Sequence, residues 1–226
     1  MDLRARQTLD ELRRLLHPAS VAQVGGFRPP QDPVTSWFCR GVGHSGEELP
    51  FHDGEPMFPL LQIRTDELPW RPPALDGVAL LVLFHNLHHY PFGKPHGEGW
   101  LIREYAALEG LRPLPARAHP YRPFPIRWQR VDDDAPGWET TWNLVDLSAV
   151  NEDDAANDAF FNDFERYRAT KVGGYPCEIQ HGTGGLDEFV FQVGLEEKVN
   201  WMWADNGIGY FFRSASGEWR WSCQFY

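Results

Sequence analysis

Two segments of this sequence match each other without a gap, and that match constrains the fold more than any other feature. FPLLQIRTDELPWRPPALDGVALLVLF occupies 58–84, and EFVFQVGLEEKVNWMWADNGIGYFFRS occupies 188–214. Gln62 in the first corresponds to Gln192 in the second (192 − 62 = 130). Each segment reads as an apolar strand with one glutamine, an acidic loop, a glycine turn and a second apolar strand. Two copies are too few for a solenoid, so the match predicts one domain built from two related halves.

A shorter similarity precedes each copy: VGGF at 24–27 and VGGY at 172–175. The repeated order predicts an α+β fold, mainly antiparallel β-sheet, whose two halves are related by a pseudo-twofold axis and carry peripheral helices. We expect a single domain over 1–226, with repeat one at about 20–90, a helix and linker region at about 91–168 and repeat two at about 169–226.

Local patterns predict three helices and a C-terminal strand. Leucine spacing favours a helix over 2–17, and an apolar stripe favours another over 100–110. The range 151–168 has Asn151 as a candidate N-cap and acidic residues in its first turn. Its predicted buried face comprises Phe160, Phe161, Phe164 and Tyr167. Strict alternation over 218–226 predicts a strand paired antiparallel with the apolar segment before it.

Two glycines mark the turns inside the copies. Gly77 follows Asp76, and Gly207 follows Asn206. Asp-Gly and Asn-Gly pairs favour turns that require a positive φ. We therefore expect a left-handed conformation at both glycines.

The composition favours a protein that binds a basic partner. The formal net charge is −11, which disfavours direct nucleic-acid binding and steers a positively charged protein toward this one. The ten tryptophans predict aromatic rings at a groove or interface, because Trp rarely buries completely. The three cysteines show no CxxC spacing, which is typical of free thiols in a reducing compartment. With no apolar signal region and no run long enough to span a bilayer, we expect a cytoplasmic protein without membrane contact.

No motif in the sequence predicts catalysis. The histidines at 85, 88, 89 and 96 lack metal-ligand spacing and are interpreted as a surface loop, although a zinc site is the sharper alternative. The range 43–47 resembles GxSxG but has Glu47 where glycine is needed. The acidic pairs at 66–67 and 196–197 are interpreted as turn caps rather than as paired catalytic carboxylates. We expect no catalytic residue, no metal ligand and no cofactor.

Four of these stretches carry a family resemblance. LLQIRTDELP, KVGGYP, FVFQV and MWADNGIGYFF resemble the YwqG-like family of bacterial proteins, described as a domain of unknown function. The similarity covers most of 20–226. Two departures lie in the first half: Phe27 is followed by Arg28 rather than proline, and the strand after Gly77 is aliphatic rather than aromatic. Proteins resembling this family often occur beside secreted bacterial toxins, and some act as immunity proteins.

The resemblance and the charge together suggest an immunity protein that binds and neutralises a cognate toxin. The expected toxin is a basic nuclease delivered by a type VI secretion system. The candidate partner-binding residues are Asp132, Asp133, Asp134, Trp138, Glu139 and Trp142, extended by Glu152, Asp153 and Asp154. The alternative is an enzyme or small-molecule-binding protein that uses a cleft between the two repeats.

Overall fold

The computed structural model describes residues 1–226 except 88, 116–117, 181 and 184–186. The strands of its main sheet are β1 (His17–Val24), β2 (Trp37–Phe38), β6 (Phe58–Arg64), β7 (Leu80–His85), β8 (Trp100–Tyr105), β10 (Phe124–Asp134), β11 (Lys171–Gly173), β12 (Glu188–Val193), β13 (Ile208–Arg213) and β14 (Trp219–Gln224). The minor strands are β3 (Val42–Gly43), β4 (Phe51–His52), β5 (Glu55–Pro56) and β9 (Arg112–Pro113). The helices are α1 (Leu3–Arg13), α2 (Trp138–Leu144), α3 (Ser148–Asn151) and α4 (Asp154–Asn162), with 3-10 turns at Thr65–Glu67 and Pro73–Leu75.

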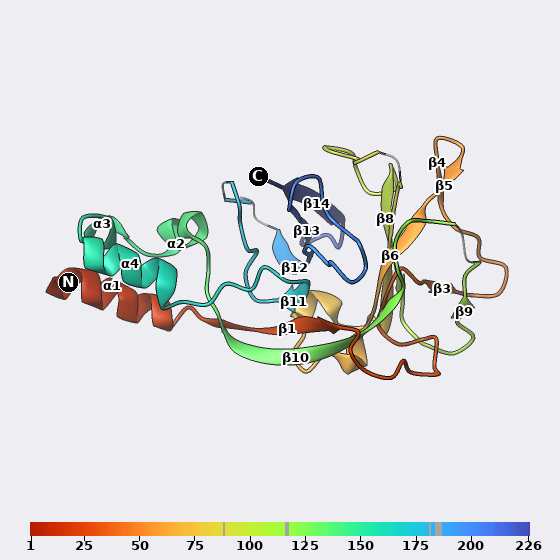
Figure 1. Ribbon diagram of the computed structural model, residues 1–226, viewed down its shortest axis with the longest axis horizontal. Coiled ribbons are helices and arrows are strands. Elements are labelled where there is room, and N and C mark those ends of the chain that lie inside the picture. The colour runs from red at the N-terminus through yellow and green to blue at the C-terminus, as the bar shows by residue number, and fades with distance from the viewer. Residues whose placement is uncertain (88, 116–117, 181, 184–186) are drawn as a thin grey trace.

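Among the described residues, ten strands form one sheet in the order β14-β13-β12-β11-β1-β10-β2-β6-β7-β8, and every neighbouring pair is antiparallel. Strands β1 and β10 form a long central ribbon, and the strands on either side follow outward in chain order (Figure 1). The two-stranded pairs β3–β9 and β4–β5 lie outside this sheet. The α+β class with a mainly antiparallel sheet is therefore confirmed.

The sheet encloses one aromatic core to which both of its ends contribute. Trp100 of β8 lies 6.0 Å from Phe211 of β13, measured between ring centroids. Glu104, also on β8, pairs with Arg213 of β13 at 3.0 Å and accepts a hydrogen bond from the Trp219 indole of β14 at 3.1 Å. Because side chains from opposite ends of the strand order meet in this way, the sheet must curve back towards itself.

The helices form a separate lobe beyond one end of the β1–β10 ribbon (Figure 1). Their core is distinct from that of the sheet and combines Leu9 and Leu12 of α1, Val150 of α3 and Phe160 of α4. These positions are fully or nearly fully buried, as expected of amphipathic helices whose apolar stripes pack together.

Two of the predicted helices need correction. The range 100–110 is not a helix: it begins with β8, where burial alternates from Trp100 to Ile102, so period two prevails over the helical spacing. The helix predicted over 151–168 is divided between α3 and α4. Asn151 ends α3 instead of capping the helix, and the Asp153 side chain caps α4 by accepting from the Ala156 N–H.

Other elements are confirmed. Helix α1 forms within 2–17, but it ends at Arg13 because His17 already begins β1. The C-terminal strand forms as β14 and pairs antiparallel with β13. Its alternation is imperfect, since Gln224 is buried and accepts from the N–H groups of Ile179 and Gln180.

The two turn glycines differ. Gly77 has φ +79°, as predicted. The prediction for Gly207 is wrong, because the positive φ values fall on Ala204 (+42°) and Asn206 (+49°). A Cβ on Gly207 would lie 2.6 Å from the Gln224 carbonyl oxygen and 2.7 Å from that of Trp203. Gly207 is therefore required for close backbone approach rather than for a left-handed turn.

The ungapped match between the two hairpins holds only in their first strands. Strands β6 and β12 carry bulges at equivalent places, between Pro59 and Leu61 and between Phe189 and Phe191. After the turn the register differs. Gln62 pairs with Val82, whereas Gln192 pairs with Tyr210 instead of residue 212, which a constant offset would require. The shift is two residues, so the faces of the strands are preserved.

The shorter similarity, between VGGF at 24–27 and VGGY at 172–175, does not mark equivalent positions in the sheet. In β2, Trp37 pairs with Gln62, and in β11, Lys171 pairs with Gln192. Gly173 lies two residues after the partner of Gln192, and Cys39 lies two residues after the partner of Gln62. The residue equivalent to Gly173 in the first half is therefore Cys39, and not a glycine of the VGGF stretch. Both residues have a positive φ, +77° for Gly173 and +58° for Cys39, so a left-handed conformation that is uncommon outside glycine occurs at equivalent places in the two halves.

Candidate functional site

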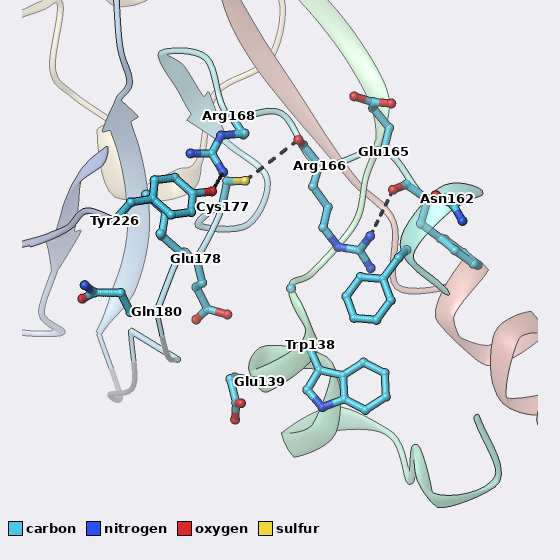
Figure 2. A pocket seen from close by; sticks show the side chains of 14 residues that line it. Trp138, Glu139, Asn162, Glu165, Arg166, Arg168, Cys177, Glu178, Gln180 and Tyr226 are labelled. Carbon is cyan, nitrogen blue, oxygen red and sulfur yellow. Dashed lines mark hydrogen bonds between the residues drawn. The ribbon is translucent and has the colours of Figure 1, made fainter. Parts of the chain in front are cut away.

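A groove of about 590 Å³ lies between the helical lobe and the second half of the sheet (Figure 2). It receives side chains from α2, from the end of α4, from the segments before and after β11, and from the C-terminus. Strand β10 ends at Asp134, and Gly137 occupies the N-cap of helix α2, which begins at Trp138. Trp138 and Glu139 lie near one end of the groove in Figure 2, and Arg168 and Tyr226 lie near the other.

An aromatic ladder forms the outer wall of the helical lobe. Trp138 and Trp142 are four residues apart on α2, so they share one face, with ring centroids 6.1 Å apart. The Trp138 ring stacks on Phe161 of α4 at 5.6 Å and 13°, and it packs edge-on against the buried Phe160. Trp142 is 47% exposed and Phe161 is 55% exposed. The ladder is thus anchored in the lobe core and presents large apolar surfaces to solvent.

The carboxylates of the groove have few partners. Glu139 and Glu165 are exposed, and among the described residues neither lies in an ion pair. Glu178 is held through Oε1, which accepts from the Thr140 hydroxyl at 3.0 Å and the Thr183 N–H at 2.7 Å. Its Oε2 is buried and has no hydrogen-bond partner among the described residues.

The two arginines of the groove are already engaged. Arg166 donates to the carbonyl oxygens of Pro136, Phe160 and Phe164, and its guanidinium lies 4.3 Å from the centroid of the Phe160 ring. Burial lowers the pKa of this guanidinium from its usual value. Arg168 donates to the Tyr226 hydroxyl. Both cations therefore support the walls of the groove, while the exposed carboxylates of Glu139 and Glu165 lie in no ion pair among the described residues.

The candidate partner-binding residues Asp132, Asp133 and Asp134 are part of strand β10, so their side chains alternate between faces. Asp132 is exposed and pairs with Arg130 at 2.7 Å. Asp133 accepts from the Tyr167 hydroxyl at 2.9 Å. Asp134 is completely buried, which removes it from any partner-binding surface.

The buried Asp134 is a structural group. Its Oδ2 accepts from the Lys171 ammonium at 2.6 Å and from the Tyr175 N–H at 2.8 Å. Burial lowers the pKa of Lys171, and the charge of Asp134 opposes that shift. The pair ties the central ribbon to β11 and to the loop that follows it.

The remaining predicted residues fall into two groups. Trp138, Glu139 and Trp142 lie together on α2, and the first two line the groove. Glu152, Asp153 and Asp154 lie at the junction of α3 and α4 and do not line it. Asp153 is occupied by capping α4 and by accepting from the Asp2 N–H at 2.7 Å.

Several groove residues escaped the sequence analysis. Phe161 was expected on a buried face, yet it is the most exposed ring of the ladder. The signal was present, because adjacent helical residues such as Phe160 and Phe161 point about 100° apart and cannot both face one core. Glu165, Arg166, Glu178 and Tyr226 come from three separate stretches, and no local pattern connects them.

The predicted surface loop of histidines is only partly correct. His85 is buried and is surrounded by the rings of Tyr90, Trp201, Trp203 and Trp221. Burial lowers its pKa to about 4. His89 and His96 are exposed, and His88 lies outside the described residues. Within the part of the chain that is described, no three His, Cys, Asp or Glu side chains are grouped so that they could hold a metal ion.

A second cleft, of about 670 Å³, lies between the loop that precedes β8 and strand β14. Its lining includes Trp100, Trp219 and Trp221.

The acidic pair at 66–67 has structural contacts: Asp66 pairs with Arg64 at 2.6 Å, and Glu67 accepts from the Ser36 N–H at 2.8 Å.

Comparison with known families gives one match. Residues 117–216, which are 100 of the 226 residues (216 − 117 + 1), match a family described as a domain of unknown function (DUF1963). The match includes α2, α4 and the second hairpin, and it covers the groove apart from Tyr226. No curated protein matches the chain. None of the helices in the described ranges is both long and apolar enough to cross a membrane.

Proposed function

We propose that this protein is an immunity protein that binds and neutralises a cognate secreted bacterial toxin, with a basic nuclease as the first candidate. The observation that carries the proposal is the aromatic ladder of Trp138, Trp142 and Phe161, two of whose rings are exposed, beside Glu139, which lies in no ion pair among the described residues. In this proposal the protein acts by binding and not by catalysis, and it works in the cytoplasm of the cell that it protects.

The ladder has the properties of an interface centre. Aromatic side chains dominate the binding energy of protein interfaces, and an exposed group of large apolar side chains on a small protein often marks such a site. Leu144, at the end of α2, adds another side chain that is 54% exposed. Trp138 is fixed by Phe160, so this wall needs little ordering when a partner binds.

Charge supports a basic partner. The net charge of −11 would accelerate association with a positively charged protein. Many proteins that attack nucleic acids are basic, and an acidic inhibitor can cover the surface that binds phosphate. The toxin as partner comes from the resemblance to the YwqG-like family and is part of the proposal.

The test is co-expression with the product of the adjacent gene, scored by growth and by complex formation on size exclusion. Trp142→Ala and Phe161→Ala should weaken the complex by more than tenfold, as expected for interface anchors. The matched control is Phe51→Ala, because Phe51 is 58% exposed on β4, outside the helical lobe. Unrescued growth together with no complex would overturn the proposal.

A second candidate function is small-molecule binding in the cleft beside β14. It is favoured by the three tryptophans Trp100, Trp219 and Trp221 in its lining, which are typical of sites for flat or sugar-like ligands. Native mass spectrometry of the purified protein would test this function, since a copurifying compound that is lost in Trp221→Ala would support it.

We also infer that the two hairpins arose by duplication. The support is the equivalent bulges of β6 and β12 and the equivalent bonding of Gln62 and Gln192. A set of homologous sequences offers the test. The first hairpins of relatives should match the second hairpin of this chain once a two-residue gap is allowed after the turn.

A further inference from the structure

We propose that the groove between the helical lobe and the sheet receives an arginine side chain of the partner. The inference deepens the proposed function and rests on it for the identity of the partner. It specifies the chemical group that the groove recognises: a planar cation, stacked on the aromatic ladder and paired with the carboxylates beside it.

The aromatic wall is suited to a cation. The stacked rings of Trp138 and Phe161 both line the groove. Tryptophan is the best aromatic acceptor for a guanidinium lying over its face. Within the described chain, arginines already lie over rings elsewhere, as Arg40 does over Trp37 and Arg127 over Phe27, each at 4.0 Å. No such contact is found in the described residues for the rings of Trp138 and Phe161.

Acidic side chains lie at the rim of the groove, where Glu139 and Glu165 are exposed. Glu178 also lines the groove, but its Oε2, which has no hydrogen-bond partner among the described residues, is buried from solvent. In Figure 2 the carboxylates of Glu139 and Glu178 lie towards the Trp138 end. A cation held there would meet a π face and acidic oxygens together.

The positive groups nearby do not compete for the same place. Arg168 is held by the Tyr226 hydroxyl near the opposite end of the groove. Arg166 is turned into the lobe, where it donates to three carbonyl oxygens and covers the Phe160 ring. Its remaining nitrogen, Nη2, is buried from solvent and therefore presents no anion site in this conformation.

Arginine fits this arrangement better than lysine. Its guanidinium is planar, is weakly hydrated, and can stack on a ring while it donates two parallel hydrogen bonds to a carboxylate. A lysine ammonium is a strongly hydrated point charge that gains less from the ring. The groove should therefore discriminate between two side chains of equal charge.

The experiment uses the full chain and N-acetyl-L-arginine amide as the probe. Binding is followed by NMR through the indole N–H signals of Trp138 and Trp142, assigned with Trp→Phe variants. The lysine analogue tests the discrimination, and the citrulline analogue, which is the neutral isostere of arginine, tests the role of charge. We expect saturable shifts at both indoles with arginine, several-fold weaker binding with lysine and none with citrulline.

Variants locate the site. Glu139→Gln should weaken binding by about two- to fivefold, because the ion pair between the Glu139 carboxylate and the guanidinium of the probe is exposed to solvent. Glu178→Gln should weaken it less than Glu139→Gln does, since the unpartnered oxygen of Glu178 is buried from solvent. Glu48→Gln is the matched control for an exposed acid in the first half of the chain, and Phe51→Ala is the control for Phe161→Ala. Neither control should alter binding.

Each contrary result is distinct. Equal shifts with citrulline, or shifts unchanged by Glu139→Gln and Phe161→Ala, would overturn the arginine site. A cognate toxin that binds these two variants as tightly as it binds the unaltered protein would also overturn it, while leaving the immunity function intact. Probe binding without any toxin partner would instead support the groove and remove the immunity function.

Discussion

Gln62 and Gln192 make the same pair of hydrogen bonds in the two halves of the sheet, and they differ at one atom. Each donates Nε2 to two backbone carbonyls: Pro33 and Thr35 for Gln62, Tyr167 and Ala169 for Gln192. The Gln192 Oε1 accepts from the Cys177 N–H at 2.9 Å. The Gln62 Oε1 is buried, and no described residue donates a hydrogen bond to it.

This difference predicts unequal roles in stability. Gln192→Leu would leave two carbonyls and one N–H unsatisfied, and it should cost about 3 kcal/mol or more. Gln62→Leu would leave only two carbonyls unsatisfied and would remove an orphan oxygen, so its cost should be about 1–2 kcal/mol smaller. Urea unfolding of the two variants makes the comparison. Equal midpoints would contradict it.

The buried pair of Asp134 and Lys171 gives a second prediction. Removing one partner by Asp134→Asn or Lys171→Met should cost about 3–5 kcal/mol, because it leaves an uncompensated buried group. The double variant Asp134→Asn with Lys171→Met should be destabilised by less than the sum of the two single changes. The exposed Asp132 on the same strand is the control, and Asp132→Asn should leave the unfolding midpoint unchanged. Additive losses would show that the two groups act independently.

Gly77 and Gly207 are required for different reasons: Gly77 for its positive φ, and Gly207 for the close approach of two backbone carbonyls. Gly77→Ala places a side chain at φ +79° in open space and should cost about 1 kcal/mol. Gly207→Ala drives a Cβ into two carbonyl oxygens and should cost about 3 kcal/mol, with a displacement of the end of β14. Chemical denaturation gives the costs. A milder effect at Gly207 would mean that this backbone contact is loose.

Glu196 predicts a loss of stability as the pH rises. Burial raises the pKa of its carboxyl from the usual 4.5 to about 7, against the opposing effects of Lys198 and Thr170. The folded state therefore binds the proton more tightly than the unfolded state. The stabilisation is complete below pH 4.5 and is lost as the pH rises through about 7.

The measurement is the urea midpoint between pH 5 and pH 8. Glu196→Gln should flatten the decline across this range, whereas Glu197→Gln, at an exposed neighbour, should retain it. A decline that persists in Glu196→Gln would assign the effect to another group.

The antiparallel sheet could be predicted because its signals are local. Alternation in β14 and the apolar runs of β6 and β12 identify strands within a few residues. Trp100–Tyr105 shows the limit of this reasoning, since a short apolar segment fits both periods and only its pairing with β7 decides between them.

The groove could not be predicted in the same way. Its walls join Trp138, Arg166, Glu178 and Tyr226, and their proximity results from packing between the lobe and the sheet. The three consecutive aspartates at 132–134 look equivalent in the sequence, yet Asp134 is buried against Lys171 and Asp132 is exposed. That difference arises from the pairing of β10 with β1 and from the lysine that β11 brings.

The central position of β1 has a consequence for how the chain is made. Val21 pairs with Gln129 on one side and with Lys171 on the other, so its partners are synthesised 108 and 150 residues later (129 − 21 and 171 − 21). On the ribosome, Val21 of β1 must therefore wait until 108 further residues have been made (129 − 21) before its first partner residue emerges. A nascent chain that stalls before β10 holds an apolar segment with both edges open, which is a target for chaperones and a starting point for aggregation. Synthesis, rather than the finished molecule, is the stage at which this protein is most vulnerable.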